Sequence, residues 1–409
     1  MPKHLQVFLL FTAAYFLSYF YRSANAVIAP DLSAELSLGP ADLGWVTSLF
    51  YLSFAAMQIP LGAALDRFGA RWVTPTLLLV GALGSLLFAA ADSLATLSVA
   101  RALIGVGMAG VLMGAMQMFS RWYRPQRFAT VTGWLVGIGS CGALLAATPM
   151  AWLNIQFGWR AVFAGGAAAV LVMAALIALL ARNAPPGHSP PPPPTGGLLG
   201  GFRTVWASRL LWRIVPMNFW MSGSNLALQG LWAGPFMYDV LGMGDVAVGN
   251  ALLGMGVGAT AGFVTSGMIA DRIGVRPLVT LTSALQVLAL LLLALLPSVW
   301  VVTLLLPVVG YCGASAMVLF AHVRRLMPDG VTGTAVTAVN LFGIGGSFVL
   351  QWCFGMVVEQ FVADAYGRYP MMAYSAALGL LALGTALALM WYVGGRRAEL
   401  RHSASQVSG

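Results

Sequence analysis

Charged side chains are scarce in this sequence. They make up 8% of its 409 residues, whereas hydrophobic residues make up 59%. Ordinary soluble domains carry about 25% charged residues. A chain with so little charge could not cover a surface that faces water, so the composition excludes a soluble globular protein.

Cysteine and histidine are also rare, with three and four residues respectively. Cys141, Cys312 and Cys353 lie inside hydrophobic runs, where cysteine usually behaves as a small buried hydrophobic residue without a disulfide. The histidines show no metal-ligand spacing, and the chain has no phosphate-binding P-loop. No nucleophile–base set appears in the runs. We therefore expect no enzyme activity, no cofactor, no metal site and no ATPase.

Long hydrophobic runs make up most of the chain. About twelve of them have the roughly 18–24 residues that a helix needs to cross a bilayer. The predicted fold class is an all-α polytopic membrane protein with twelve transmembrane helices. The first run lacks a small-residue cleavage site, so we expect no cleaved signal peptide. The expected spans are 7–29, 42–64, 73–91, 95–119, 129–152, 161–182, 211–235, 247–269, 277–296, 300–322, 334–358 and 370–392.

A stretch rich in proline and glycine separates the sixth span from the seventh. It reads "RNAPPGHSPPPPPTGGLLGG" at 182–201, which suits an extended linker and no packed core. The predicted organisation is a six-helix half, a cytoplasmic linker, a second six-helix half and a cytoplasmic tail, at residues 1–182, 183–210, 211–392 and 393–409.

The arginines predict the orientation in the membrane. Nearly all of those outside the spans fall on one side, and only Arg160 and Arg368 fall on the other. By the positive-inside rule the arginine-rich side, with both termini, is cytoplasmic. We expect a multi-pass protein of a bacterial inner membrane. These arginines are scattered over short loops and form no contiguous patch, which argues against nucleic-acid binding.

A charged decapeptide occurs once in each half. "GAALDRFGAR" occupies 62–71 and "GMIADRIGVR" occupies 267–276, and both fit G-x-x-x-D-R-x-G-x-R. Each joins the second and third span of its half on the arginine-rich side. Two six-helix halves with the same element at the same place are parallel repeats, related by an axis along the membrane normal.

On this motif the sequence resembles the major facilitator superfamily. The resemblance covers the whole chain and implies alternating access by two rocking halves, usually in a monomer. In that family the loop holds the cytoplasmic side closed through its acid and arginines. The resemblance therefore implies gate roles for Gly62, Asp66, Arg67, Arg71, Asp271, Arg272 and Arg276. The alternative is a loop that only obeys the positive-inside rule.

Arg22 is the sharpest candidate for substrate binding. It lies about two-thirds of the way along the first span, where an arginine costs about 3 kcal/mol to insert. All acidic residues lie in loops or at helix ends, so no protein counter-ion is evident. A site with unpaired positive charge suits an anionic solute. Tyr15, Ser18 and Asn25 recur at helical spacing with Arg22 and share its face.

Polar faces on other spans could complete the same site. Arg101, in "LSVARALIGVGMAG", lies near the outer end of the fourth span and could snorkel, so its role as a structural, coupling or substrate residue stays open. Polar residues can also act merely as interhelical contacts. The remaining candidates are Ser222, Asn225, Gln229 and Trp232 on the seventh span and Asn340, Ser347 and Gln351 on the eleventh.

The stretch "YFYRSANAVIAPDL" resembles the first helix of organophosphate–phosphate antiporters and anion–cation symporters. In those branches an arginine at the position of Arg22 engages anionic substrate. Phosphate carriers of this kind pair it with an arginine in the seventh helix, whereas here that span has no charge beyond Arg213 at its edge. A single cation suits a small carboxylate better than a phosphate dianion.

Two other substrate classes stay open. An amino acid or short peptide could place its carboxylate on Arg22 and its amine on aromatic rings. A multidrug efflux antiporter is less well supported, because the glycines Gly133 and Gly142 are followed by Ala146 and Ala147 where the efflux signature has Gly-Pro. The coupling ion, a proton or sodium, is left open, as are a receptor role and the direction of transport.

Overall fold

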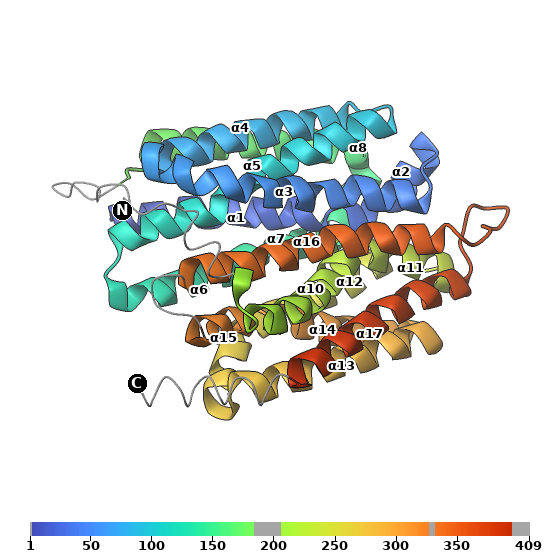
Figure 1. The fold of residues 1–409 in the computed structure, drawn as a ribbon. Helices are drawn as coiled ribbons and strands as arrows, with labels where there is room; N and C mark the ends of the chain where they lie inside the picture. Colours follow the sequence, from blue (N-terminus) through green and yellow to red (C-terminus); the bar gives the residue numbers. More distant parts are fainter. Residues whose placement is uncertain (1, 184–205, 327–331, 395–409) are drawn as a thin grey trace.

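The computed structural model describes residues 2–183, 206–326 and 332–394, and within these ranges it is helical and contains no strand (Figure 1). The helices of the first half are α1 (Lys3–Ser23), α2 (Asn25–Leu36), α3 (Pro40–Phe68), α4 (Ala70–Ala89), α5 (Leu94–Trp122), α6 (Pro125–Ser140), α7 (Gly142–Leu145) and α8 (Thr148–Leu180). Those of the second half are α10 (Leu211–Ala227), the π-helix η1 (Leu228–Trp232), α11 (Ala233–Leu241), α12 (Asp245–Ile273), α13 (Val275–Leu295), α14 (Val299–Ser315), α15 (Val318–Leu326), α16 (Thr332–Val358) and α17 (Met371–Gly394).

These helices make twelve crossings in two sets of six, which confirms the predicted fold class. Among the described residues, nine helical segments are long and apolar enough to cross a membrane. The other three crossings are α3, then α6–α7 with the first part of α8, and finally α10–η1–α11. The predicted linker and tail lie largely outside the described residues, so the domain boundaries stay predictions.

Several crossings are broken where the predicted spans were continuous. The first is interrupted at Ala24, between α1 and α2. Gly158, where α8 bends with a φ of 76° in the left-handed region, instead lies between the predicted spans 129–152 and 161–182, and the fifth crossing ends and the sixth begins there. The seventh contains the π-helix η1, and a π-helical turn inserts one extra residue into the helical repeat.

Hydrophobic side chains cover the outside of the bundle as well as its interior. Leu83, Trp134 and Leu304 are among the large apolar residues exposed on the surface, as expected where a helix faces lipid. Between the helices lie buried aromatic residues such as Phe50 and Phe88. Polar side chains in the middle of the bundle therefore point inward, where groups on other helices must supply their hydrogen bonds.

The two halves contact each other closely at one end of the bundle, which we call the sealed end. There α3 and α16 lie side by side (Figure 1), and the Trp45 and Trp352 rings lie 5.1 Å apart between centroids. A Cβ added to Gly44 would lie 2.9 Å from the carbonyl oxygen of Gln351. A Cβ added to Gly234 would overlap the carbonyl oxygen of Ala26. Only glycine permits so close an approach of two backbones.

The opposite end, where α1 begins and α17 ends, carries both decapeptides, and we call it the arginine-rich end (Figure 1). In each decapeptide the helices meet at a glycine with positive φ, 75° at Gly69 and 93° at Gly274. Arg71 Nε donates to the carbonyl of Ala178 at 3.1 Å, and Arg276 Nη2 donates to that of Tyr392 at 2.7 Å. Both of these contacts stay within one half.

Candidate functional site

A cavity of about 160 Å³ lies between the two halves. The first half lines it with one charge, aromatic rings and two aliphatic side chains: Tyr15, Tyr19, Arg22, Phe54, Leu112 and Val136. The second half contributes amides, one hydroxyl and apolar groups: Asn218, Ser222, Asn225, Leu226, Phe263, Gly313, Ala314, Met317, Phe320, Asn340, Gly343 and Ile344.

Among the described residues that line this cavity, Arg22 is the one with a charge. Its Cζ lies 4.8 Å from the ring centroid of Tyr19 and 5.3 Å from that of Phe54, so the guanidinium rests on aromatic faces. Its Nε is buried without a hydrogen-bond partner. Within the described part of the chain, the one ion pair joins two other residues, Arg160 and Glu35.

The break after α1 places Arg22 in the last helical turn, where backbone carbonyls lack partners within their own helix. The amide of Ala24 donates to the carbonyl of Phe20 at 3.0 Å. Arg101 Nη1 donates to the carbonyl of Tyr21 at 3.0 Å, which fixes the backbone directly before Arg22.

Arg101 is fully buried inside the first half and does not line the cavity. The idea that its guanidinium snorkels toward the outer end of the helix is therefore wrong. The side chain instead crosses to α1, where the backbone carbonyl of Tyr21 accepts its hydrogen bond.

The opposite wall is built around amides on α10 and α16. Asn218 and Ser222 are occupied by structural hydrogen bonds: Asn218 Nδ2 donates to the carbonyl of Val339 at 2.7 Å, and Ser222 donates to Asn218 Oδ1 at 2.9 Å. Asn225 Oδ1 is buried against Gly313 and has no hydrogen-bond partner. Asn225 and Asn340 are therefore the amides on this wall with the most hydrogen-bonding capacity left for a solute.

Several predicted substrate residues lie away from the cavity. Asn25, after the helix break, donates to Thr47 Oγ1 at 2.9 Å, and Ser18 Oγ is buried without a partner. Trp232 donates to the carbonyl of Gln351 at 2.7 Å at the sealed end, where the Gln351 amide is fully buried. Gln229, in η1, does not line the cavity either.

Among the lining residues that were missed at the sequence level are Tyr19, Phe54 and Asn218. Tyr19 and Asn218 carried a usable signal, because each lies four residues from a predicted member of the same helix face, Tyr15 and Ser222. Phe54 lies in a generally apolar stretch of α3, where nothing in its spacing separates a wall residue from a core residue.

The predicted gate residues all map to the arginine-rich end. Arg67 is exposed with its Cζ 5.3 Å from the Phe68 ring, and Asp271 and Arg272 are exposed in the last turn of α12. The side chain of Asp66 lies outside the described part of the chain. A Cβ on Gly62 would meet nothing within 4 Å, so packing in this conformation does not explain that glycine.

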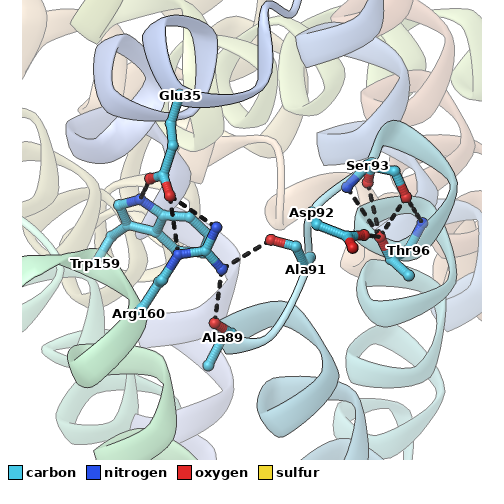
Figure 2. Close-up of polar contacts among 8 residues, drawn as sticks. All are labelled: Glu35, Ala89, Ala91, Asp92, Ser93, Thr96, Trp159 and Arg160. Carbon is cyan, nitrogen blue, oxygen red and sulfur yellow. Dashed lines mark hydrogen bonds and ion pairs between the residues drawn. The ribbon is translucent and has the colours of Figure 1, made fainter.

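A second polar cluster lies at the sealed end, beside the bend of α8 (Figure 2). Arg160 donates to Glu35 Oε1 from Nε at 3.0 Å and from Nη2 at 2.8 Å, and Trp159 Nε1 donates to Glu35 Oε2 at 2.8 Å. Arg160 Nη1 also donates to the carbonyls of Ala89 and Ala91 at 2.9 and 2.7 Å. The cluster ties α2, the end of α4 and α8 into one unit.

No residues of the described chain gather as a metal site: groups of three or more His, Cys, Asp or Glu in metal-binding proximity are absent from it. The chemistry available in the cavity is therefore that of one guanidinium, several aromatic rings and neutral amides. Such a set binds and orients a solute.

Comparison with known proteins identifies the family. Residues 11–351 match the family model of the Major Facilitator Superfamily. A bacterial homologue of the human lysosomal transporter Spinster, in an inward-facing and unoccupied conformation, has a TM-score of 0.74 and 18% identity, covering 100% of this chain and 98% of that one. A structure of the nucleoside transporter NupG has a TM-score of 0.77 and 14% identity, covering 96% and 99%.

Curated relatives match over a shorter region. A probable sulfoacetate transporter, SauU, of Cupriavidus necator is 30% identical over 149 residues, which is 36% of this chain and 35% of that protein. A hexuronate transporter of Bacillus subtilis is 26% identical over 159 residues, 39% and 38% of the two chains. The match thus spans little more than a third of the length of these relatives.

Proposed function

The chain belongs to the Major Facilitator Superfamily, and we propose that it is a secondary active transporter that moves a small organic anion of the carboxylate type by alternating access. The observation that carries this proposal is Arg22. Its guanidinium lies on the wall of a cavity between the two halves, without an ion pair to any described residue.

The cost of a buried charge supports an anionic solute. An arginine at membrane depth is expensive unless something pairs with it, and the aromatic rings beside Arg22 offset only part of that cost. A carboxylate can take two parallel hydrogen bonds from one guanidinium. A phosphate dianion would leave one charge without a partner in the cavity, since no other described lining residue is charged.

The names of the relatives support the same substrate class. SauU is named for sulfoacetate and the Bacillus subtilis protein for hexuronate, both organic acids. We further propose that the protein lies in a bacterial inner membrane with both termini cytoplasmic, acts as a monomer, and couples transport to a proton or sodium gradient. The arginine-rich end then faces the cytoplasm.

The arrangement of the halves supports alternating access. They are packed together at the sealed end, and at the other end the contacts of Arg71 with Ala178 and of Arg276 with Tyr392 each stay within one half. Rocking of the halves about the cavity would break the sealed end and bring the decapeptide loops into contact.

A zwitterionic solute is the second candidate. Tyr15 and Tyr19 line the cavity beside Arg22, with their rings 5.1 Å apart between centroids. Aromatic faces attract an ammonium group, so an amino acid or short peptide could use the same arginine and the same rings. Lipophilic cations, by contrast, would face the positive charge of Arg22 with no acid among the described wall residues to compensate.

A substrate panel in proteoliposomes tests the proposal. Small carboxylates, amino acids and lipophilic cations are each supplied with and without proton or sodium gradients. We expect uptake of a carboxylate that is lost in Arg22→Gln and strongly reduced in Arg22→Lys, because an ammonium lacks the two-pronged geometry. Arg209→Gln, which removes an exposed arginine outside the cavity, is the matched control. Gradient-driven transport of a lipophilic cation, and of no anion, would overturn the proposal.

A further inference from the structure

Arg101 uses few of its hydrogen bonds although it is fully buried. Nη1 donates to the carbonyl of Tyr21, whereas Nε and Nη2 are buried without partners. An arginine needed only to cap one carbonyl could be replaced by a neutral donor, such as the amide of glutamine, at much lower desolvation cost. The charge itself therefore calls for an explanation.

Arg101 and Arg22 share one aromatic ring. The centroid of Phe50 lies 5.3 Å from Arg101 Cζ and 5.9 Å from Arg22 Cζ. The two guanidinium groups are therefore within about 11 Å of each other, and Phe50 is fully buried. Charges at that separation in a protein interior interact measurably, because little water screens them.

The described acidic residues do not neutralise this pair. Within the described side chains the ion-paired acid is Glu35, which binds Arg160 at the sealed end. The acidic residues of the sequence lie in loops or at helix ends. Two positive charges thus act on the central region, one on the wall of the cavity and one behind Phe50.

We propose that Arg101 is a second charge of the anion site that never touches the solute. It raises the positive potential in the cavity from behind Phe50 and positions Arg22 through the carbonyl of Tyr21. This inference rests on the proposed anion transport for its biological meaning, because a raised positive potential attracts an anion before contact is made. Its test uses no substrate, so its failure is distinguishable from failure of the proposed function.

The test measures the potential in the cavity directly. Ser222→Cys places a thiol on the cavity wall in a chain whose Cys141, Cys312 and Cys353 are replaced by alanine. Two thiol reagents of similar size are compared: an ethyl methanethiosulfonate bearing a sulfonate, and one bearing a trimethylammonium. The ratio of their reaction rates reports the local potential and cancels changes in access that affect both reagents equally.

Removing the charge of Arg101 should change this ratio. In Arg101→Gln the ratio of anionic to cationic rate should fall roughly tenfold, as expected for one charge acting across a protein interior. Arg101→Met, an apolar replacement of similar length that a buried site accepts readily, should give the same fall. Arg101→Lys keeps the charge and should keep the wild-type ratio. Arg22→Gln should lower the ratio further than Arg101→Gln or Arg101→Met does.

A purely structural Arg101 gives a different result. Both rates would then rise or fall together in Arg101→Gln and Arg101→Met, and the ratio would stay at the wild-type value. That outcome would overturn the proposal even if substrate binding were lost. A fall in the ratio in Arg101→Lys equal to that in Arg101→Met would also overturn it, because the charge would then be irrelevant. Should Arg101→Gln fail to fold, Arg101→Met provides the measurement.

Discussion

Arg160 and Arg22 are the same side chain in opposite circumstances. Arg160, at the sealed end, donates hydrogen bonds to Glu35 and to the carbonyls of Ala89 and Ala91 (Figure 2). Arg22, between the halves, lies on aromatic rings and has no acid beside it among the described residues. The first side chain is committed to the fold, and the second has its bonding capacity available for a solute.

This difference separates structural from functional charge more clearly than depth in the membrane does. The Arg160 side chain is 37% exposed and yet fully engaged, while Arg101 is buried and only partly engaged. Counting the N–H groups that have hydrogen-bond partners ranks Arg160 as structural, Arg101 as intermediate and Arg22 as functional. The predictions below test that ranking.

The largest effect is expected for Arg22→Gln. Losing two charge-assisted hydrogen bonds to a carboxylate should weaken binding by at least about 100-fold. The ligand-free protein should melt at the same temperature or higher, because an unpaired charge leaves the membrane interior. A solute at about 100 times its dissociation constant should stabilise the wild type by roughly 2.7 kcal/mol and the variant hardly at all. A variant that melts early and still responds to the solute would make Arg22 a structural residue.

Asp66→Asn, in the first decapeptide, should slow transport by about tenfold or more while binding stays nearly unchanged, because the gate assignment places it in the conformational change. Asp271→Asn should act in the same direction but more weakly. Transport rates in proteoliposomes are compared with the binding affinity of the same preparations. A normal transport rate in Asp66→Asn would contradict the gate assignment.

Arg160→Gln should give the reverse of the Arg22 result. We expect a loss of stability on the order of 1 kcal/mol, since exposed ion pairs are worth little and the carbonyls of α4 regain water. Solute affinity should remain within about twofold of wild type, because the cluster lies outside the cavity. Thermal unfolding with and without solute measures both quantities. Lost affinity with unchanged stability would reverse the ranking of the two arginines.

The smallest effect concerns pH. Glu35 lies in the exposed last turn of α2, beyond the predicted membrane span 7–29, and hydrogen bonds from Arg160 and Trp159 hold the pKa of its carboxyl below the ordinary value. A lowered pKa means that its stabilising contribution is complete above about pH 4.3 and is lost only as the pH falls through the lower, folded-state value. The melting difference between wild type and Glu35→Gln should therefore be constant from neutral pH down to about that value, and then shrink.

The sequence identifies the crossings, the repeat and Arg22 because each rests on a pattern that folding does not alter. Hydrophobic run length, motif spacing and an isolated charge can be recognised without knowing the helix phase, that is, the direction in which each residue faces around the helix axis. The cavity residues depend on phase, and there the prediction of one continuous helix face fails. Ser222 and Asn225 precede η1 and line the cavity. Gln229 and Trp232 lie within η1 and do not line the cavity.

The reason is geometric. One extra residue in a π-helical turn rotates everything after it by about 100° relative to a regular helix. In the first crossing, Asn25 follows the interruption at Ala24, donates to Thr47 Oγ1 and does not line the cavity. Pro235, which has no N–H to donate to the carbonyl of Leu231, closely follows η1 and is a local signal for that interruption.

The glycine contacts at the sealed end have a thermodynamic consequence. Across that end the halves meet through close backbone approaches, tilted aromatic rings and neutral hydrogen bonds, such as Tyr238 to the carbonyl of Val27 at 3.3 Å. No ion pair between described residues joins them. Opening this end should therefore respond little to ionic strength, while the apolar surface it exposes to water should give the step a positive heat capacity change. The free energy of opening the sealed end should then depend on temperature along a curve, as the free energy of unfolding does. An end closed by ion pairs would not be expected to show this curvature.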